Sequence, residues 1–203
     1  MILQAALHRG AVVLLVTAAL RLVEETLVAA GQAAAGNIVN WKEFTRSYAV
    51  WDSTQIKGFF GWGDDEYGFL SNFCPAPTYF EGVMYPTSEH AYMASKTIYH
   101  KEREAILRAA TPAEAKHIGQ QVTLRINWDE VKKSYMLAVV FDKFWRNKDL
   151  RNRLIATSHR YLEETNHWGD RYYGVDYETR EGKNVLGRIL MDVRAILRNY
   201  PTI

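Results

Sequence analysis

The sequence predicts a single α+β domain that is predominantly helical and carries a small β-sheet. Helix-spaced apolar residues and helix-start signals dominate the body of the chain, whereas the strand-like runs are few and short. A chain of 203 residues is long enough to bury a substantial core, and a content of 48% apolar and 13% aromatic residues is typical of a folded globular protein.

Three segments predict the main helices. Residues 111–114, TPAE, form a capping box with proline at the first helical position, and Gly119 can end the helix that follows. Over residues 128–147, apolar and aromatic side chains recur every three to four positions, which predicts a long central helix. Residues 185–199 repeat this periodicity and stop before Pro201, which cannot continue a helix.

Three short runs predict the strands. Residues 56–60, IKGFF, form one strand, and residues 77–86, PTYFEGVMYP, form a hairpin that turns at Gly82. Residues 160–166, RYLEETN, are a third candidate. Together these runs predict a small sheet beside a larger helical part.

The first forty residues differ in composition from the rest of the chain. The apolar run at 11–20, AVVLLVTAAL, is well short of the roughly 20 apolar residues that a membrane span needs. Charged residues follow the run at once, which favours an amphipathic helix; a signal-peptide core cleaved after 33–36 and a membrane-surface helix are the alternatives. We expect a helical extension over 1–40 and one domain over 41–203.

Charge and cysteine content narrow the class of protein. The formal net charge is +2, which does not by itself require a nucleic-acid partner. The single cysteine, Cys74, excludes a disulfide within the chain and fits the cytoplasm. The six histidines show no metal-ligand spacing, so we expect no metal site, and we also expect no cofactor and no membrane partner.

The stretch at 85–96, YPTSEHAYMASK, has two interpretations. Thr87 stands where an N-cap should, so Glu89 falls in the first helical turn, where free N–H groups and the helix dipole favour an ionised carboxylate. A charge that only stabilises the helix start is the commoner case. However, Glu89, Met93 and Lys96 share one helix face, and a carboxylate with a cation beside it is suited to a sugar phosphate.

Other stretches combine polar and aromatic residues. Asn72 lies between bulky apolar residues, either as part of a turn or as a contact to a polar ligand with Phe73 as an apolar wall. Trp168 beside Gly169 is either a loop or a stacking plate against open backbone. Trp128, taken alone, is a core residue.

Basic residues occur in two of these stretches. Arg125 is either a surface charge or an anion clamp. Lys183 and Asn184 precede the last predicted helix, either as a loop with an N-cap or as a phosphate cradle.

Taken in order, five motifs resemble the NADAR family, which is named for its association with NAD and ADP-ribose and includes a bacterial N-glycosidase of riboflavin-biosynthesis intermediates. The resemblance runs from about Gly58 to Arg198. It rests on FLSNF, YPTSEH with Lys96, RINWDEVK, WGD and GKNVLGRILM.

The resemblance implies hydrolysis of the bond between ribose C1′ and a base-like nitrogen. Its substrates are phosphoribosylamino-pyrimidines in one branch and, in another, ADP-ribosylated guanine in DNA, so ADP-ribosylated nucleic acid is a second class of partner. The family's catalytic carboxylate falls on Glu89, and Asp170 is our second candidate, for proton delivery. The expected substrate-binding residues are Asn72, Phe73, Lys96, Arg125, Trp128, Trp168, Gly169, Lys183 and Asn184.

The chain departs from the family pattern in two places. Family members often carry glutamines where this chain has Met93 and Ser95, and the segment between Asp170 and Gly182 is longer and more aromatic than in the bacterial enzyme. Both departures bear on substrate choice. A non-catalytic module that binds ADP-ribose or NAD derivatives, and a purely structural domain, are the alternatives to an enzyme.

Overall fold

The computed structural model describes residues 55–59 and 66–199 of the chain. All of them belong to one compact unit, Asp52–Ile203. The extension expected over residues 1–40 lies outside the described residues, and its helical structure stays a prediction.

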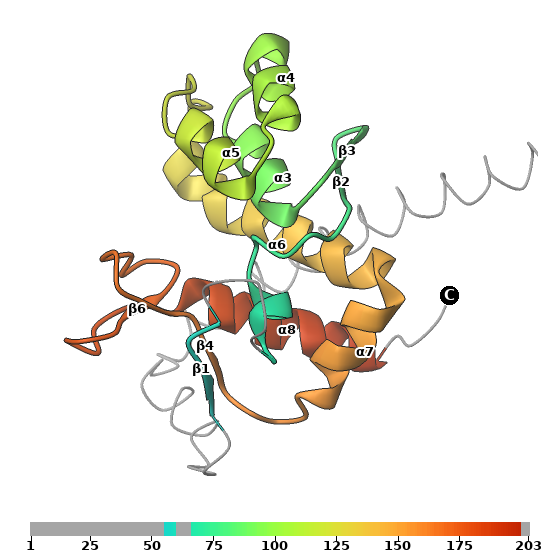
Figure 1. Cartoon of the computed structure of the whole chain (residues 1–203), viewed down its shortest axis with the longest axis vertical. Helices are drawn as coiled ribbons and strands as arrows, with labels where there is room; N and C mark the ends of the chain where they lie inside the picture. The colour runs from blue at the N-terminus through green and yellow to red at the C-terminus, as the bar shows by residue number, and fades with distance from the viewer. Residues whose placement is uncertain (1–54, 60–65, 200–203) are drawn as a thin grey trace, which may run out of the picture. The chain divides into compact units, whose positions relative to one another are not determined.

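Six α-helices make up much of the described part of the chain (Figure 1). In order they are α3 (Ser88–Ser95), α4 (His100–Arg108), α5 (Pro112–Gly119), α6 (Trp128–Arg146), α7 (Lys148–Ala156) and α8 (Val185–Asn199), and a 3₁₀ turn, η1, covers Gly68–Leu70. The helices predicted at the positions of α5, α6 and α8 are confirmed. Helices α4 and α7 were not predicted from the sequence; each buries a single side chain completely, Ile106 in α4 and Leu154 in α7.

The strands form three separate two-stranded ladders in place of the one small sheet that we expected. These are β1 (Ile56–Lys57) with β4 (Leu162–Glu163), parallel; β2 (Thr78–Phe80) with β3 (Val83–Tyr85), antiparallel; and β5 (Thr165–Asn166) with β6 (Val175–Asp176), parallel. The predicted hairpin is confirmed: Glu81 and Gly82 both have positive φ, 42° and 89°, as a two-residue turn requires.

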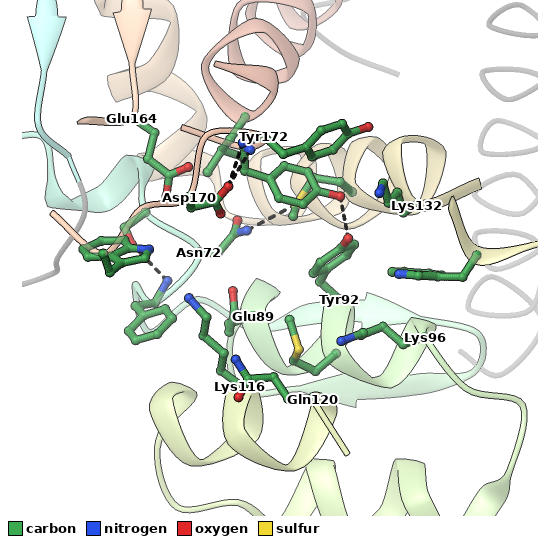
Figure 2. Close-up of a pocket in the computed structure, with 18 residues that line it drawn as sticks. Asn72, Glu89, Tyr92, Lys96, Lys116, Gln120, Lys132, Glu164, Asp170 and Tyr172 are labelled. Carbon is green, nitrogen blue, oxygen red and sulfur yellow. Dashed lines mark hydrogen bonds between the residues drawn. The ribbon is translucent and has the colours of Figure 1, made fainter. Parts of the chain in front are cut away.

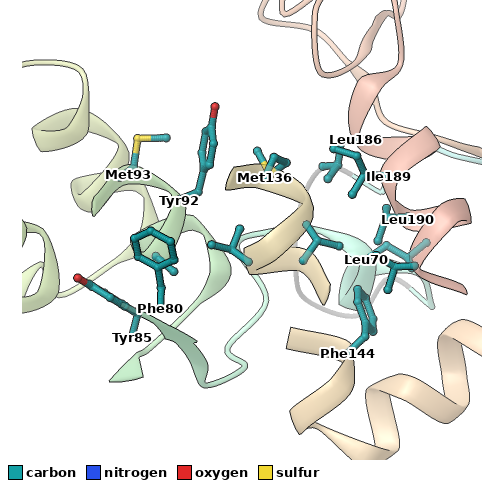
Figure 3. Close-up of a cluster of buried hydrophobic side chains, with 14 of the residues drawn as sticks. Leu70, Phe80, Tyr85, Tyr92, Met93, Met136, Phe144, Leu186, Ile189 and Leu190 are labelled. Carbon is teal, nitrogen blue, oxygen red and sulfur yellow. The ribbon is translucent and has the colours of Figure 1, made fainter. Parts of the chain in front are cut away.

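Helix α6 lies at the centre of this arrangement, with α3 and the β2–β3 hairpin on one side and α7 and α8 on the other (Figure 1). The buried side chains run through the same layers (Figure 3): Tyr92 and Phe80 on one side of Met136, Phe144 and Leu190 on the other. Each fully buried apolar side chain of this size contributes about 1.5–3 kcal/mol relative to an exposed one. The fold class is therefore confirmed as α+β and mainly helical.

Candidate active site

A cavity of about 530 Å³ opens among α3, α5, α6 and the loop that follows β4 (Figure 2). Seven of the residues predicted from the sequence line it, although they come from segments far apart in the chain. They are Asn72, Phe73, Glu89, Lys96, Trp128, Trp168 and Asp170.

The start of α3 fixes Glu89 in the cavity wall. As predicted, Thr87 is the N-cap: its Oγ1 accepts a hydrogen bond from the His90 N–H at 3.3 Å. The Glu89 N–H donates to the carbonyl oxygen of Asn72 at 3.0 Å, and Ser88 Oγ donates to Asn72 Oδ1 at 3.2 Å. The loop that carries Asn72 is therefore bonded to the helix that carries Glu89, so the two side chains enter the cavity together.

His90, next to Glu89, has a structural role. Its Nδ1 lies 2.8 Å from Thr87 Oγ1, and its Nε2 lies 3.2 Å from the carbonyl oxygen of Ala109. Burial lowers the pKa of His90, so the ring is held neutral between these two partners.

The Glu89 carboxyl is not the fully ionised group that its helix position suggests. The residue is 6% exposed, and no described residue donates a hydrogen bond to its carboxyl. Burial raises the pKa of Glu89 from 4.5 to about 7; Lys116 and Lys96 lower it, and Asp170 raises it. The effect of burial on the pKa thus exceeds that of the helix N-terminus, which favours the ionised form. Near neutral pH Glu89 can therefore both hold and release a proton.

Lysine ammonium groups from three helices lie around the cavity. Lys96 Nζ, at the end of α3, donates to the Gly119 carbonyl at 2.5 Å. Lys116, on α5, lies 6.0 Å from the ring centre of Phe73 and 5.5 Å from that of Trp168. Lys132, on α6, lies 4.5 Å from the ring centre of Tyr172. Figure 2 shows Lys116 close to Glu89, with Lys96 and Lys132 further along the cavity.

Aromatic rings form the remaining wall. Trp128 packs against Tyr92, with 5.6 Å between ring centres, and the hydroxyls of Tyr92 and Tyr173 lie 2.5 Å apart. Trp128 is buried as predicted for a core residue, and it lines the cavity as well. Trp168, in contrast, is 50% exposed at the edge of the cavity, where a ring can stack on an incoming planar group.

Asp170 lines the cavity, but its carboxyl also holds the loop. Its Oδ1 accepts hydrogen bonds from the N–H groups of Tyr172 and Tyr173, at 3.0 and 2.9 Å. The oxygen that binds these two donors is committed to the turn. This geometry suits a positioning role better than the proton delivery that we assigned to Asp170 as a second choice.

Four of the predicted binding residues lie outside the cavity lining. Arg125 donates to the Ser95 carbonyl through Nε at 2.6 Å and pairs with Glu81 at 3.1 Å, so it ties the hairpin to α3. Lys183 is exposed, with Nζ 5.5 Å from the centre of the Tyr172 ring. Gly169 adopts φ +78° in the loop that follows β5, a conformation that favours glycine.

Asn184 is the fourth of these residues, and it is an anchor inside the protein. It is 2% exposed. Its side-chain amide donates to the Leu162 carbonyl at 2.8 Å and accepts from the Glu164 N–H at 3.1 Å. We expected a phosphate cradle at Lys183 and Asn184. In the structure Asn184 anchors the main chain beside β4, and neither residue lines the cavity.

Several residues that line the cavity were not predicted from the sequence, chiefly Lys116, Glu164, Tyr92 and Tyr173. Lys116 lies in a short helix where a lysine resembles any solvated charge, and only packing of α5 against α3 brings it to Glu89. Glu164 had a signal: two successive glutamates in a predicted strand are unusual, because glutamate is depleted in strands.

Comparison with known proteins agrees with the geometry. Residues 58–198 match the profile described as the NADAR domain. The chain belongs to the NADAR family. The resemblance seen in the sequence motifs is thus confirmed, over the range that those motifs cover.

Relatives of this NADAR chain carry enzyme names. N-glycosidase YbiA of Escherichia coli is 38% identical over 136 residues, which cover 64% of this chain and 81% of YbiA. An N-glycosidase of Nostoc punctiforme is 37% identical, covering 66% and 87%. A riboflavin biosynthesis protein of Vibrio vulnificus is 36% identical, covering 68% of this chain and 37% of that protein. The expectation of an enzyme of the N-glycosidase class is confirmed by these relatives.

The NADAR fold is also shared with a solved structure. The NMR structure of the E. coli protein YbiA matches with a TM-score of 0.64 and 37% identity, over 72% of this chain and 86% of YbiA. Among the described residues, no helix is long and apolar enough to cross a membrane. The same residues contain no group of three or more histidine, cysteine or acidic side chains that could hold a metal ion.

Proposed function

We propose that this protein hydrolyses the bond between ribose C1′ and the amino nitrogen of a phosphoribosylamino-pyrimidine. The observation that carries the proposal is the Glu89 carboxyl, buried in a cavity with lysines along one side and aromatic rings along another. The riboflavin-related name of one relative supports this substrate class.

The chemistry requires a carboxylate close to the sugar. Breaking the C1′–N bond passes through an oxocarbenium-like transition state, by analogy with glycoside hydrolysis. An ionised Glu89 stabilises the positive charge that develops on the ring and accepts a proton from the attacking water. Because the cavity raises the pKa of Glu89 to about 7, this carboxylate is basic enough to take that proton near neutral pH.

The two walls suit the two ends of such a substrate. Lys96 and Lys132 carry positive charge at the part of the cavity away from Lys116, where a phosphate can bind (Figure 2). Phe73 and Trp168 flank Lys116 and offer faces against which a pyrimidine can stack. In this orientation the ribose lies between them, beside Glu89.

The two departures from the family pattern within α3 have different consequences. Met93 lines the cavity, so it contacts the substrate directly as a soft apolar surface. Ser95 is fully buried and donates to the Tyr92 carbonyl at 2.6 Å, away from the cavity. Within α3 it is therefore Met93, and not Ser95, that bears on which substrate the cavity accepts.

The test is a direct comparison of substrates with the purified full-length chain. We would incubate it separately with a phosphoribosylamino-pyrimidine, guanine-ADP-ribosylated DNA and NAD, and measure released base and sugar by mass spectrometry. The proposal predicts rapid release from the first substrate. Faster release from the ADP-ribosylated DNA would move the substrate to that class, and tight ADP-ribose binding with no cleavage of any of the three would identify a binding module.

A further inference from the structure

A second carboxyl, that of Glu164, faces the same cavity, and one of its oxygens has no hydrogen-bond partner among the described residues. Glu164 lies between β4 and β5. Within residues 55–59 and 66–199, its Oε2 is the one fully buried side-chain oxygen or nitrogen atom without a hydrogen bond. Leaving a buried polar atom unpaired costs about 1–3 kcal/mol, so its presence asks for an explanation.

The backbone of Glu164 is held from both sides. Its N–H donates to Asn184 Oδ1 at 3.1 Å, and its carbonyl accepts from the Val175 N–H at 2.8 Å. Gly174 is packed so closely that a Cβ there would lie 2.6 Å from the Glu164 carbonyl oxygen. The carboxyl is therefore presented to the cavity by a fixed piece of main chain, as Figure 2 shows.

The neighbours of Glu164 favour its protonated form. Burial raises its pKa to about 8, the charges of Asp170 and Glu89 raise it as well, and Lys116 lowers it. Glu89 lies across the cavity and has a pKa of about 7, which Lys116 and Lys96 lower. The lysines thus favour the ionised form of Glu89, whereas burial and two neighbouring carboxylates favour the protonated form of Glu164, and acid–base catalysis needs such a pair of states.

We propose that Glu164 is the catalytic acid that delivers a proton to the departing nitrogen. This inference rests on the proposed function, because it assigns a residue to the same reaction. The unpaired Oε2 is explained in this way: it finds its partner when the substrate nitrogen enters the cavity.

The step balances with two carboxyls and one water. As the C1′–N bond breaks, its electron pair stays on the nitrogen, which takes the proton of the Glu164 carboxylic acid. The water oxygen bonds to C1′, and Glu89 takes the proton that the water loses. The products are a sugar with a free C1′ hydroxyl and a free amine, and proton exchange with solvent returns Glu164 and Glu89 to their starting states.

Asp170 is less suited to this task. Its Oδ1 already binds the N–H groups of Tyr172 and Tyr173. Its negative charge beside Glu164 instead helps to keep the proton on Glu164.

The test compares two leaving groups on the same 5-phosphoribose. A phosphoribosylamino-pyrimidine needs a proton on its nitrogen, whereas nicotinamide mononucleotide releases neutral nicotinamide from a cation and needs none. We expect Glu164→Gln to lower kcat on the aminopyrimidine by roughly 10²–10⁴-fold and on the nicotinamide compound by less than about 5-fold. Glu89→Gln lowers both rates, because both reactions share the sugar transition state.

A matched control comes from the preceding residue. Glu163 accepts hydrogen bonds from Thr165 and Arg180, outside the cavity lining, and a glutamine oxygen can still accept both. Glu163→Gln should therefore keep both activities. Circular dichroism and thermal unfolding of each variant would establish that it is folded.

The pH dependence gives a second readout that a purely structural role would not change. The wild-type rate on the aminopyrimidine should rise through about pH 7 as Glu89 ionises and fall through about pH 8 as Glu164 loses its proton. Glu164→Gln should lose the alkaline limb. The role of Glu164 would be overturned if Glu164→Gln lowered kcat equally on both substrates, or if the alkaline limb persisted in this variant. If wild type does not cleave the nicotinamide compound, the pH profile alone decides. No aminopyrimidine turnover by wild type would instead overturn the proposed function.

Discussion

Replacing Glu89 by glutamine should lower the activity of the protein strongly and, at alkaline pH, make its fold more stable. The change keeps the shape of the side chain and removes its charge. Moving the pKa of a buried carboxyl from 4.5 to about 7 costs the folded state about 3 kcal/mol when the group is ionised, at 1.36 kcal/mol per pH unit. The lost acid–base contribution lowers kcat by roughly 10²–10⁴-fold.

Whether this group's contribution to stability rises or falls with pH depends on whether the folded or the unfolded chain holds the Glu89 proton. Between pH 4.5 and about 7 the unfolded chain has lost the Glu89 proton while the folded chain still holds it, so this group's contribution to stability falls as pH rises. Above about pH 7 both states are ionised and the loss is complete. Glu89→Gln has no such loss, so the variant should gain up to about 3 kcal/mol on wild type between pH 4.5 and pH 8.

The assay is urea unfolding of the two full-length proteins at pH 4.5, 6 and 8, followed by tryptophan fluorescence, with activity measured on the same samples. Glu104→Gln is the control: its side chain is 40% exposed in an ion pair with Arg108, and its removal should change stability by under about 1 kcal/mol at every pH. If the difference in the free energy of unfolding between Glu89→Gln and wild type stayed constant from pH 4.5 to pH 8, the conclusion that burial raises the pKa of Glu89 would be refuted.

Three further substitutions test the rest of the cavity. Gly119→Ala should destabilise the fold by about 1–3 kcal/mol in thermal unfolding, because its Cβ would lie 2.6 Å from Met93 Cβ and push α5 from α3; an unchanged Tm would contradict that close packing. Lys116→Met should move the acidic limb of the pH–rate profile upward, because Lys116 lowers the pKa of Glu89; an unmoved limb would refute the coupling. Trp168→Ala should raise KM by about 5- to 150-fold, the equivalent of 1–3 kcal/mol of base stacking, with stability nearly unchanged because the residue is 50% exposed; an unchanged KM would exclude stacking.

The sequence was most informative where structure is local. Thr87 caps α3 and so places Glu89 in its first turn, and both facts depend on neighbouring residues alone. The hairpin at Gly82 was predictable for the same reason, since its turn needs positive φ at adjacent positions. What sequence spacing could not provide was the electrostatic environment of Glu89, because burial depends on what packs over it.

The missed and misplaced residues depend on contacts between distant segments. Lys116 reaches Glu89 only because α5 packs on α3, and Glu164 enters the cavity only because Asn184, twenty residues on, holds its backbone. Asn184 itself was taken for a ligand contact because an asparagine after a glycine and a lysine resembles a phosphate cradle. In the fold it is a buried anchor with φ +48°.

The central claim, that water attacks ribose C1′ and releases an intact amine, is tested most directly by hydrolysis in H₂¹⁸O. The purified protein would be incubated with a phosphoribosylamino-pyrimidine, and the masses of both products would be measured by mass spectrometry. The account predicts one ¹⁸O atom in the ribose phosphate and none in the pyrimidine. It also predicts that Glu89→Gln forms neither product at an appreciable rate. An ¹⁸O atom in the pyrimidine, which would mean that the base-side bond is cut, or full turnover by Glu89→Gln, would contradict it.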